Sequence, residues 1–158
     1  MKKILKTTLV LTLAFLLLFS FAACSRKEEP KAPVSTEEAS SAPIEKVGLW
    51  KDAIYTEDTS FGEGAKTVVV KVEADGQSVT FTLHTDKTDL ADALLEHNLV
   101  SGDDSQFGLY IKRVNGILAD YNVDQTYWGF FQNGETMMTG VDGTEIKGGE
   151  CFELVRTK

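Results

Sequence analysis

The chain has 158 residues and a formal net charge of −8, with 16 Lys and Arg against 24 Asp and Glu. This length suits one domain of ordinary size. The acidic balance argues against nucleic acid as a partner and against electrostatic adhesion to anionic lipid.

The first 23 residues have the pattern of a secretory signal peptide, because three lysines precede an almost purely apolar run over 7–21. The run is also close to the length of a membrane span, so an uncleaved anchor stays an alternative. The sequence FAAC at 21–24 resembles the bacterial lipobox, which implies lipidation of Cys24 and an anchor at the extracellular face of the cell membrane. Loss of the three lysines changes the net charge to −11.

A tether and a strap are expected before the folded domain. All three prolines of the chain lie in 25–46, among many Glu, Ser and Ala residues and without an aromatic side chain. Such a segment cannot bury enough apolar surface to become ordered, so residues 24–46 are interpreted as the lipidated cysteine and a disordered tether. Residues 47–64 show no clear periodicity and are interpreted as an extended strap on the edge of a domain that spans 65–158.

Hydrophobic periodicity predicts the first elements of this domain. Apolar and polar residues alternate over 66–74 and 78–85, on either side of Asp75-Gly76, which is typical of a β-hairpin. The leucines of 85–100 follow a period near 3.6 and predict an amphipathic helix that ends near Asn98. The polar run 101–108 is predicted to be a loop.

Four strand-like runs follow the predicted loop: 109–117, 127–132, 135–140 and 150–156. Asn133-Gly134 predicts a tight hairpin between two of them. The resulting order, β-β-α-β-β-β-β, describes an α+β domain of the β-grasp (ubiquitin-like) type, in which one main helix packs across a mixed sheet.

No constellation of residues predicts catalysis, so we expect a protein that is not an enzyme. His84 falls on the polar side of a strand and His97 near a helix end, and both are interpreted as structural. Cys151 is expected to be a buried, inert thiol. Neither a metal nor a cofactor is expected, because the histidines and cysteines lack a metal-binding spacing.

The aromatic run YWGFFQ at 127–132 raises one structural question. In a strand, Tyr127 and Phe131 face one side, while Trp128 and Phe130 face the other. One helix covers one face, so the second set lies under the strap or remains open. The first alternative makes these rings core; the second makes Trp128 and Phe130 a binding platform.

The motifs FGLYIKRVNGI (107–117) and YWGFFQNGE (127–135), followed by Gly140, resemble the transcobalamin-like C-terminal domain. This β-grasp module occurs in animal vitamin B12 carriers and in many bacterial surface lipoproteins, and the likeness runs from about Lys66 to the C-terminus. In the carriers these two segments face the corrinoid. Carried over by position, the resemblance implies ligand contacts from Phe107, Gly108, Leu109, Trp128, Phe130, Asn133, Gly134, Glu135, Thr136 and Met137.

Together these features predict a non-catalytic, lipid-anchored extracellular binding module. Its expected partner is a corrinoid, another small and partly apolar ligand, or an envelope protein, with the membrane reached only through the lipid. The alternative is a structural or protein-interaction domain of the cell envelope without a small-molecule ligand. Nucleic acid is not an expected partner.

Overall fold

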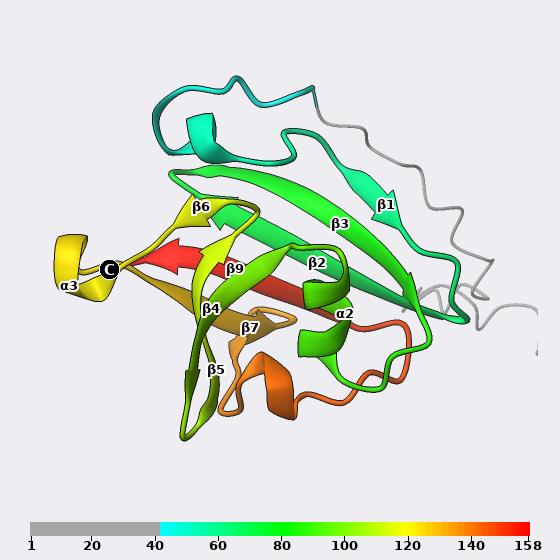
Figure 1. Cartoon of the computed structure of the whole chain (residues 1–158). Coiled ribbons are helices and arrows are strands. Elements are labelled where there is room, and N and C mark those ends of the chain that lie inside the picture. The colour runs from blue at the N-terminus through cyan, green and yellow to red at the C-terminus, as the bar shows by residue number, and fades with distance from the viewer. Residues whose placement is uncertain (1–41) are drawn as a thin grey trace, which may run out of the picture. The chain divides into compact units, whose positions relative to one another are not determined.

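The computed structural model describes residues 42–158. The expected signal peptide, Cys24 and most of the expected tether lie outside the described residues. The described chain combines a large sheet, a small sheet and a few short helices (Figure 1), which confirms the predicted α+β class. No helix within 42–158 is long and apolar enough to cross a membrane.

The large sheet contains six strands in the order β1-β3-β2-β9-β7-β8. Their bounds are β1 Thr59–Phe61, β2 Lys66–Ala74, β3 Gln77–Thr85, β7 Tyr127–Gln132, β8 Glu135–Thr136 and β9 Cys151–Thr157. The pairs β1–β3 and β2–β9 are parallel, and the other neighbours are antiparallel. The last strand of the chain therefore lies inside the sheet, between β2 and β7.

Both predicted hairpins are confirmed. Ala74 pairs with Gln77 across Asp75-Gly76, and Gln132 pairs with Glu135 across Asn133-Gly134. All four turn residues have positive φ, between 53° and 80°. Asp-Gly and Asn-Gly are the pairs that tolerate this left-handed backbone in a two-residue turn.

The small sheet corrects the loop predicted at 101–108. It contains β4 Val100–Ser105, β5 Gly108–Val114 and β6 Ile117–Leu118, in that order. Residues 101–105 are all exposed, so β4 shows no apolar alternation and owes its strand conformation to pairing with β5. The predicted strand at 135–140 is also too long, since only β8 is extended there.

The helical segments are short. Within 42–158 they are the 3₁₀ helices η1 Gly48–Asp52 and η2 Val141–Gly143, and the α-helices α2 Leu90–Glu96 and α3 Tyr121–Asp124. The predicted helix is α2; Asp89 caps it by accepting a hydrogen bond from the Ala91 amide at 2.9 Å, and Asn98 follows its end with φ 54°. The single turn of α3 shows no hydrophobic periodicity, which is why it was not predicted.

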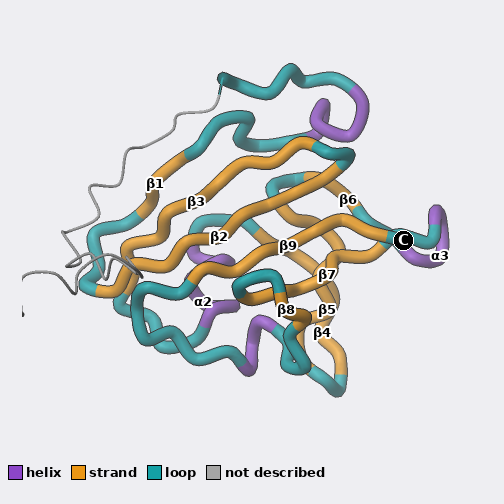
Figure 2. The backbone as a smooth tube through the Cα atoms, turned by 180° about the vertical axis from the view of Figure 1, so that it is seen from behind, coloured by secondary structure: helices purple, strands orange, loops and turns teal. Residues whose placement is uncertain are grey.

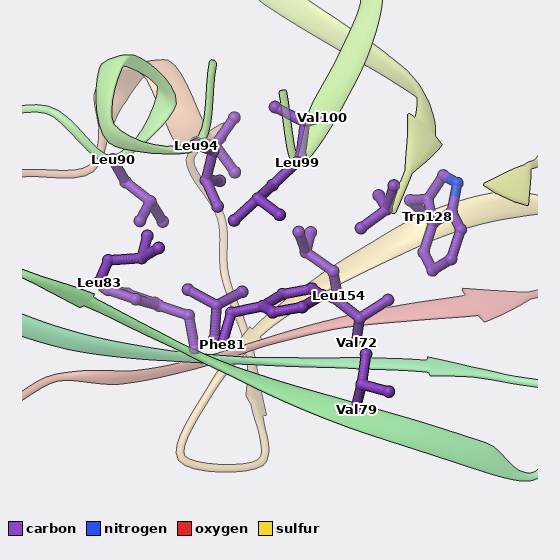
Figure 3. Packing of buried hydrophobic residues seen from close by; sticks show 14 of the residues in the cluster. Val72, Val79, Phe81, Leu83, Leu90, Leu94, Leu99, Val100, Trp128 and Leu154 are labelled. Carbon is purple, nitrogen blue, oxygen red and sulfur yellow. The ribbon is translucent and has the colours of Figure 1, made fainter. Parts of the chain in front are cut away.

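The core lies on one face of the large sheet. Val70, Phe81 and Phe152 stand in register on this face and are fully buried. Leu90 and Leu94 of α2 pack above them, beside residues of the small sheet (Figure 3). The opposite face is only half-buried, and no described helix or strand covers β2, β3 and β9 on that side (Figure 2).

The segment 42–64 packs along the β3 side of the core. The Trp50 indole is buried and donates to the Ala74 carbonyl at 2.9 Å. The ring of Phe61 lies 5.1 Å from that of Tyr55 and 5.8 Å from that of Phe81. This segment therefore covers the β3 side of the sheet.

One buried side chain fastens this segment to the small sheet. Asn115, in the β5–β6 turn, accepts a hydrogen bond from the Tyr55 amide at 2.9 Å and donates to the Tyr55 carbonyl at 2.7 Å. Its own carbonyl accepts from the Ile54 amide at 3.0 Å. Asn115 thus holds two residues of an otherwise irregular segment through its side chain and backbone together.

Candidate binding surface at the hairpin tips

The predicted ligand contacts come mainly from the β4–β5 hairpin of the small sheet and the β7–β8 hairpin of the large sheet, and strands β5 and β7 contact each other. We define the tip surface as Phe107–Leu109 of the β4–β5 hairpin together with Asn133–Met138 of the β7–β8 hairpin. Phe107 is 84% exposed and Met138 is 96% exposed. Large apolar side chains that reach so far into solvent are candidates for contact with a ligand or partner.

Asp142 of η2 braces the β4–β5 hairpin. Its Oδ2 accepts a hydrogen bond from the Leu109 amide at 2.8 Å. Inside the turn, the Ser105 hydroxyl donates to the Gly108 carbonyl at 2.6 Å and accepts from the Phe107 amide at 3.1 Å. Figure 1 shows η2 beside this turn. Sequence reasoning missed Asp142, because DGTE at 142–145 looks like an ordinary solvated turn.

The β7–β8 hairpin is held through its backbone. The Gly134 amide donates to Glu153 Oε1 at 2.9 Å, and the Met137 amide donates to the Phe130 carbonyl at 2.9 Å. The side chains of Asn133, Glu135 and Thr136 are exposed. They are therefore accessible on a turn whose backbone is fixed.

The structure corrects the proposed platform at Trp128. The indole is only 8% exposed and belongs to the core, where the small sheet rather than the 47–64 segment lies against β7. Its Nε1 is buried and has no hydrogen-bond partner among the described residues. Phe130 is half-buried, with its ring 5.6 Å from that of Phe152.

The accessible rings of β7 are those on its other face. Tyr127 is 41% exposed and Phe131 is half-buried, on the side of the sheet that no described element covers. Gly129 lies between them, and the Phe131 ring occupies the space above it, within 2.9 Å of where a Cβ would stand. Trp128 thus belongs to the core and Phe130 packs against Phe152, so these two rings do not form an open platform.

The remaining reactive side chains lie outside the tip surface. His84 Nδ1 is 3.1 Å from Thr67 Oγ1, and the His97 ring stacks on Phe61 at 5.0 Å. Cys151, expected to be buried, is half-buried on the open face, and burial together with the charge of Glu153 raises the pKa of its thiol. Within 42–158, no three His, Cys, Asp or Glu side chains form a cluster that could hold a metal ion.

Gly108→Ala should cost more stability than Gly134→Ala, although both glycines have positive φ, 98° and 80°. A Cβ at 108 would fall 1.7 Å from Asp142 Oδ2, whereas a Cβ at 134 meets nothing within 4 Å. We expect losses of about 3 and about 1 kcal/mol in the free energy of unfolding, measured by urea denaturation. Adding Asp142→Ala should recover part of the Gly108→Ala loss; equal losses for the two glycines would contradict the brace.

Comparison with known proteins places this arrangement in a family. A family model described as a domain of unknown function, DUF4430, matches residues 88–151. A solved structure described as a "putative metal binding protein" from Ruminococcus gnavus ATCC 29149 is also similar, with a sequence identity of 32% and a TM-score of 0.56. The match covers 59% of this chain and 97% of that chain.

Haptocorrin in complex with Cbi also matches, at 21% identity and a TM-score of 0.47, over 62% of this chain and 26% of haptocorrin. The chain thus spans about a quarter of haptocorrin. No curated protein matches the chain. On the likeness to the Ruminococcus protein and the family model, the chain belongs to the DUF4430 family.

Proposed function

We propose that the chain is a non-catalytic binding module of β-grasp type, lipid-anchored at Cys24 on the extracellular face of a bacterial membrane. In this proposal the tip surface takes a small, partly apolar ligand, and a corrinoid is the first candidate. The anchor rests on the FAAC sequence at 21–24. It predicts that Cys24→Ser releases the protein from membranes in a fractionation assay.

The observation that carries the proposal is the exposure of Phe107, on a turn braced by Asp142, and of Met138, which follows the bonded amide of Met137. An apolar side chain on a fixed backbone loses little conformational freedom when it binds, so more of its burial appears as affinity. A disordered tip would lack this advantage. The brace from Asp142 holds the backbone at Phe107, and the bond from the Met137 amide to the Phe130 carbonyl holds the backbone next to Met138.

The tip surface also offers polar groups that suit an amide-bearing ligand. The side-chain amide of Asn133 is exposed and has no hydrogen-bond partner among the described residues. The Gly134 amide is already used by Glu153, so Asn133 rather than Gly134 is the donor that we assign to ligand binding. Phe107 and Met138 replace Trp128 as the apolar contacts.

Titration of the protein with cobinamide and with cobalamin, followed by calorimetry, tests the proposal. We expect Phe107→Ala and Met138→Ala each to weaken binding about three- to tenfold, as loss of a partly buried apolar contact would. Val123→Ala is the matched control, since Val123 is 79% exposed on α3, near the start of β7, whereas the tip surface lies at its end.

Two results would decide against this assignment. If neither corrinoid gives heat at millimolar concentration, the corrinoid is excluded and the structural or protein-interaction domain becomes the better reading. If Val123→Ala weakens binding as much as Phe107→Ala does, the ligand does not bind at the tip surface. Binding that only the tip variants weaken supports the proposal.

A further inference from the structure

A hollow lies away from the tip surface, where three segments meet. It has a volume of about 250 Å³ and is bounded by Ile54, by Asn98–Ser101 between α2 and the start of β4, and by Arg113 and Gly116 of the β5–β6 hairpin. No residue of the tip surface contributes to it. It is therefore independent of the site proposed above.

Backbone hydrogen bonds to the buried Asn115 hold the walls of this hollow in place. The Ile54 amide binds the Asn115 carbonyl, and the Asn115 amide binds the Leu99 carbonyl at 2.7 Å, so both apolar walls attach to one turn. Gly116 has φ 81°, and a Cβ there would fall 2.3 Å from the Asp52 carbonyl oxygen. The hollow is thus preformed and need not be ordered by a ligand.

Arg113 gives the hollow a positive charge. It stands in register with Ser101 on β4, and its Nη1 donates to the Gly116 carbonyl at 3.0 Å, which orients the guanidinium. Among residues 42–158, Arg156 pairs with Asp124, but no carboxylate pairs with Arg113. Since a guanidinium has five N–H donors, most of those of Arg113 remain available.

The surrounding groups narrow the ligand class. Ser101 and Asn98 add a hydroxyl and an amide, and the described residues form no side-chain hydrogen bond with either. Ile54 and Leu99 supply apolar wall. The paired N–H donors of a guanidinium can bind both oxygens of a carboxylate, and the apolar wall can pack against an apolar tail. A carboxylate with an apolar tail therefore fits both features of the hollow.

We propose that this hollow binds a terminal carboxylate attached to a short apolar group, from either a free monocarboxylic acid or the C-terminal residue of a peptide. At about 30 Å³ for each water-sized unit, the volume admits on the order of eight non-hydrogen atoms. Hexanoate has this size and carries both features. We expect it to bind with a dissociation constant on the order of 1 mM, since so small a ligand makes few contacts.

The test is a titration of the full chain in detergent micelles, followed by amide chemical shifts of Ser101 and Gly116. Hexanoate and N-acetylleucine represent the two sources, and 1-hexanol has the same tail without the carboxylate. We expect saturable shifts with at least one of the acids and about tenfold weaker binding of the alcohol. The tighter acid identifies the source.

Variants locate the binding. Arg113→Gln should weaken binding of the acid about tenfold. The affinity of Arg113→Lys should lie between those of Arg113→Gln and the unchanged protein, because lysine keeps the charge but loses the paired N–H donors of arginine. Lys112→Gln is the control; it removes the same charge from the adjacent residue, which pairs with Asp103 on the other side of β5. It should change affinity less than about twofold.

Three results would overturn the proposal: no shift with either acid, equal binding of 1-hexanol, or equal weakening by Arg113→Gln and Lys112→Gln. The comparison with the alcohol uses the unchanged protein, so it stands even if Arg113→Gln disturbs the fold. The corrinoid titration reports on Phe107 and Met138 instead, so failure of either proposal leaves the other to be judged separately.

Discussion

Asn115→Ala is expected to lower the free energy of unfolding by about 4 kcal/mol. The side chain is fully buried and makes two hydrogen bonds to the backbone of Tyr55. Its loss removes both bonds and leaves the Tyr55 amide and carbonyl without partners. An unpaired buried polar group costs about 1–3 kcal/mol, whereas a satisfied one adds only about 1 kcal/mol of net stability.

The chain contains a matched control in Asn133→Ala. Asn133 and Asn115 both have positive φ, 53° and 51°, and both precede a glycine in a two-residue turn between strands. Only the Asn115 side chain holds a second segment. The left-handed backbone alone should therefore cost Asn133→Ala about 1 kcal/mol of unfolding free energy. The difference in stability between the two variants then gives the contribution of the hydrogen bonds from the Asn115 side chain to Tyr55.

Urea denaturation of the two variants measures this difference. We expect Asn115→Asp to lie between them, since it keeps the acceptor for the Tyr55 amide but loses the donor for the carbonyl. Hydrogen exchange should also show faster opening at Ile54 and Tyr55 in Asn115→Ala. Equal costs for the alanine variants would mean that Asn115 acts only through its turn conformation.

The elements that could be predicted from the sequence are those specified by local chemistry. Asp75-Gly76 and Asn133-Gly134 demand left-handed turns, and the alternating valines of β2 demand a half-buried strand. The α2 leucines repeat with the period of a helix. Each signal lies within a few residues of the structure that it specifies.

The elements that were missed depend on residues distant in the sequence. β4 is exposed from Ser101 to Ser105, and only its pairing with β5 makes it a strand. Without β4 there is no small sheet, and without that sheet the prediction had to leave Trp128 under the 47–64 segment or open. The wrong loop at 101–108 and the open question about the exposure of Trp128 therefore have one cause.

The tip surface could likewise be predicted only in part, because some of its contacts come from residues distant in the sequence. The resemblance selected Phe107–Leu109 and Asn133–Met137, and the structure places them on two hairpins whose strands β5 and β7 contact each other. It could not reveal the brace, because Asp142 reaches Leu109 across 33 residues. Arg113 was also overlooked, since an isolated arginine in an alternating strand gives no local sign of the hollow beside it.

Trp128→Ala is expected to cost about 3–5 kcal/mol of unfolding free energy, as removal of a large buried aromatic side chain usually does. Trp128→Phe should cost much less, because it keeps an aromatic ring and removes an indole N–H that has no partner among the described residues. Release of that desolvated group is worth about 1–3 kcal/mol, which offsets part of the lost packing.

Tyr127→Ala serves as the control for Trp128→Ala, because the neighbouring ring is 41% exposed on the opposite face of the same strand. We expect it to change stability by less than about 1 kcal/mol. Thermal and urea unfolding of the three variants measure the order of their stabilities. If Trp128→Ala is as stable as Tyr127→Ala, the indole is not part of the core, and the open platform becomes the correct description of this strand after all.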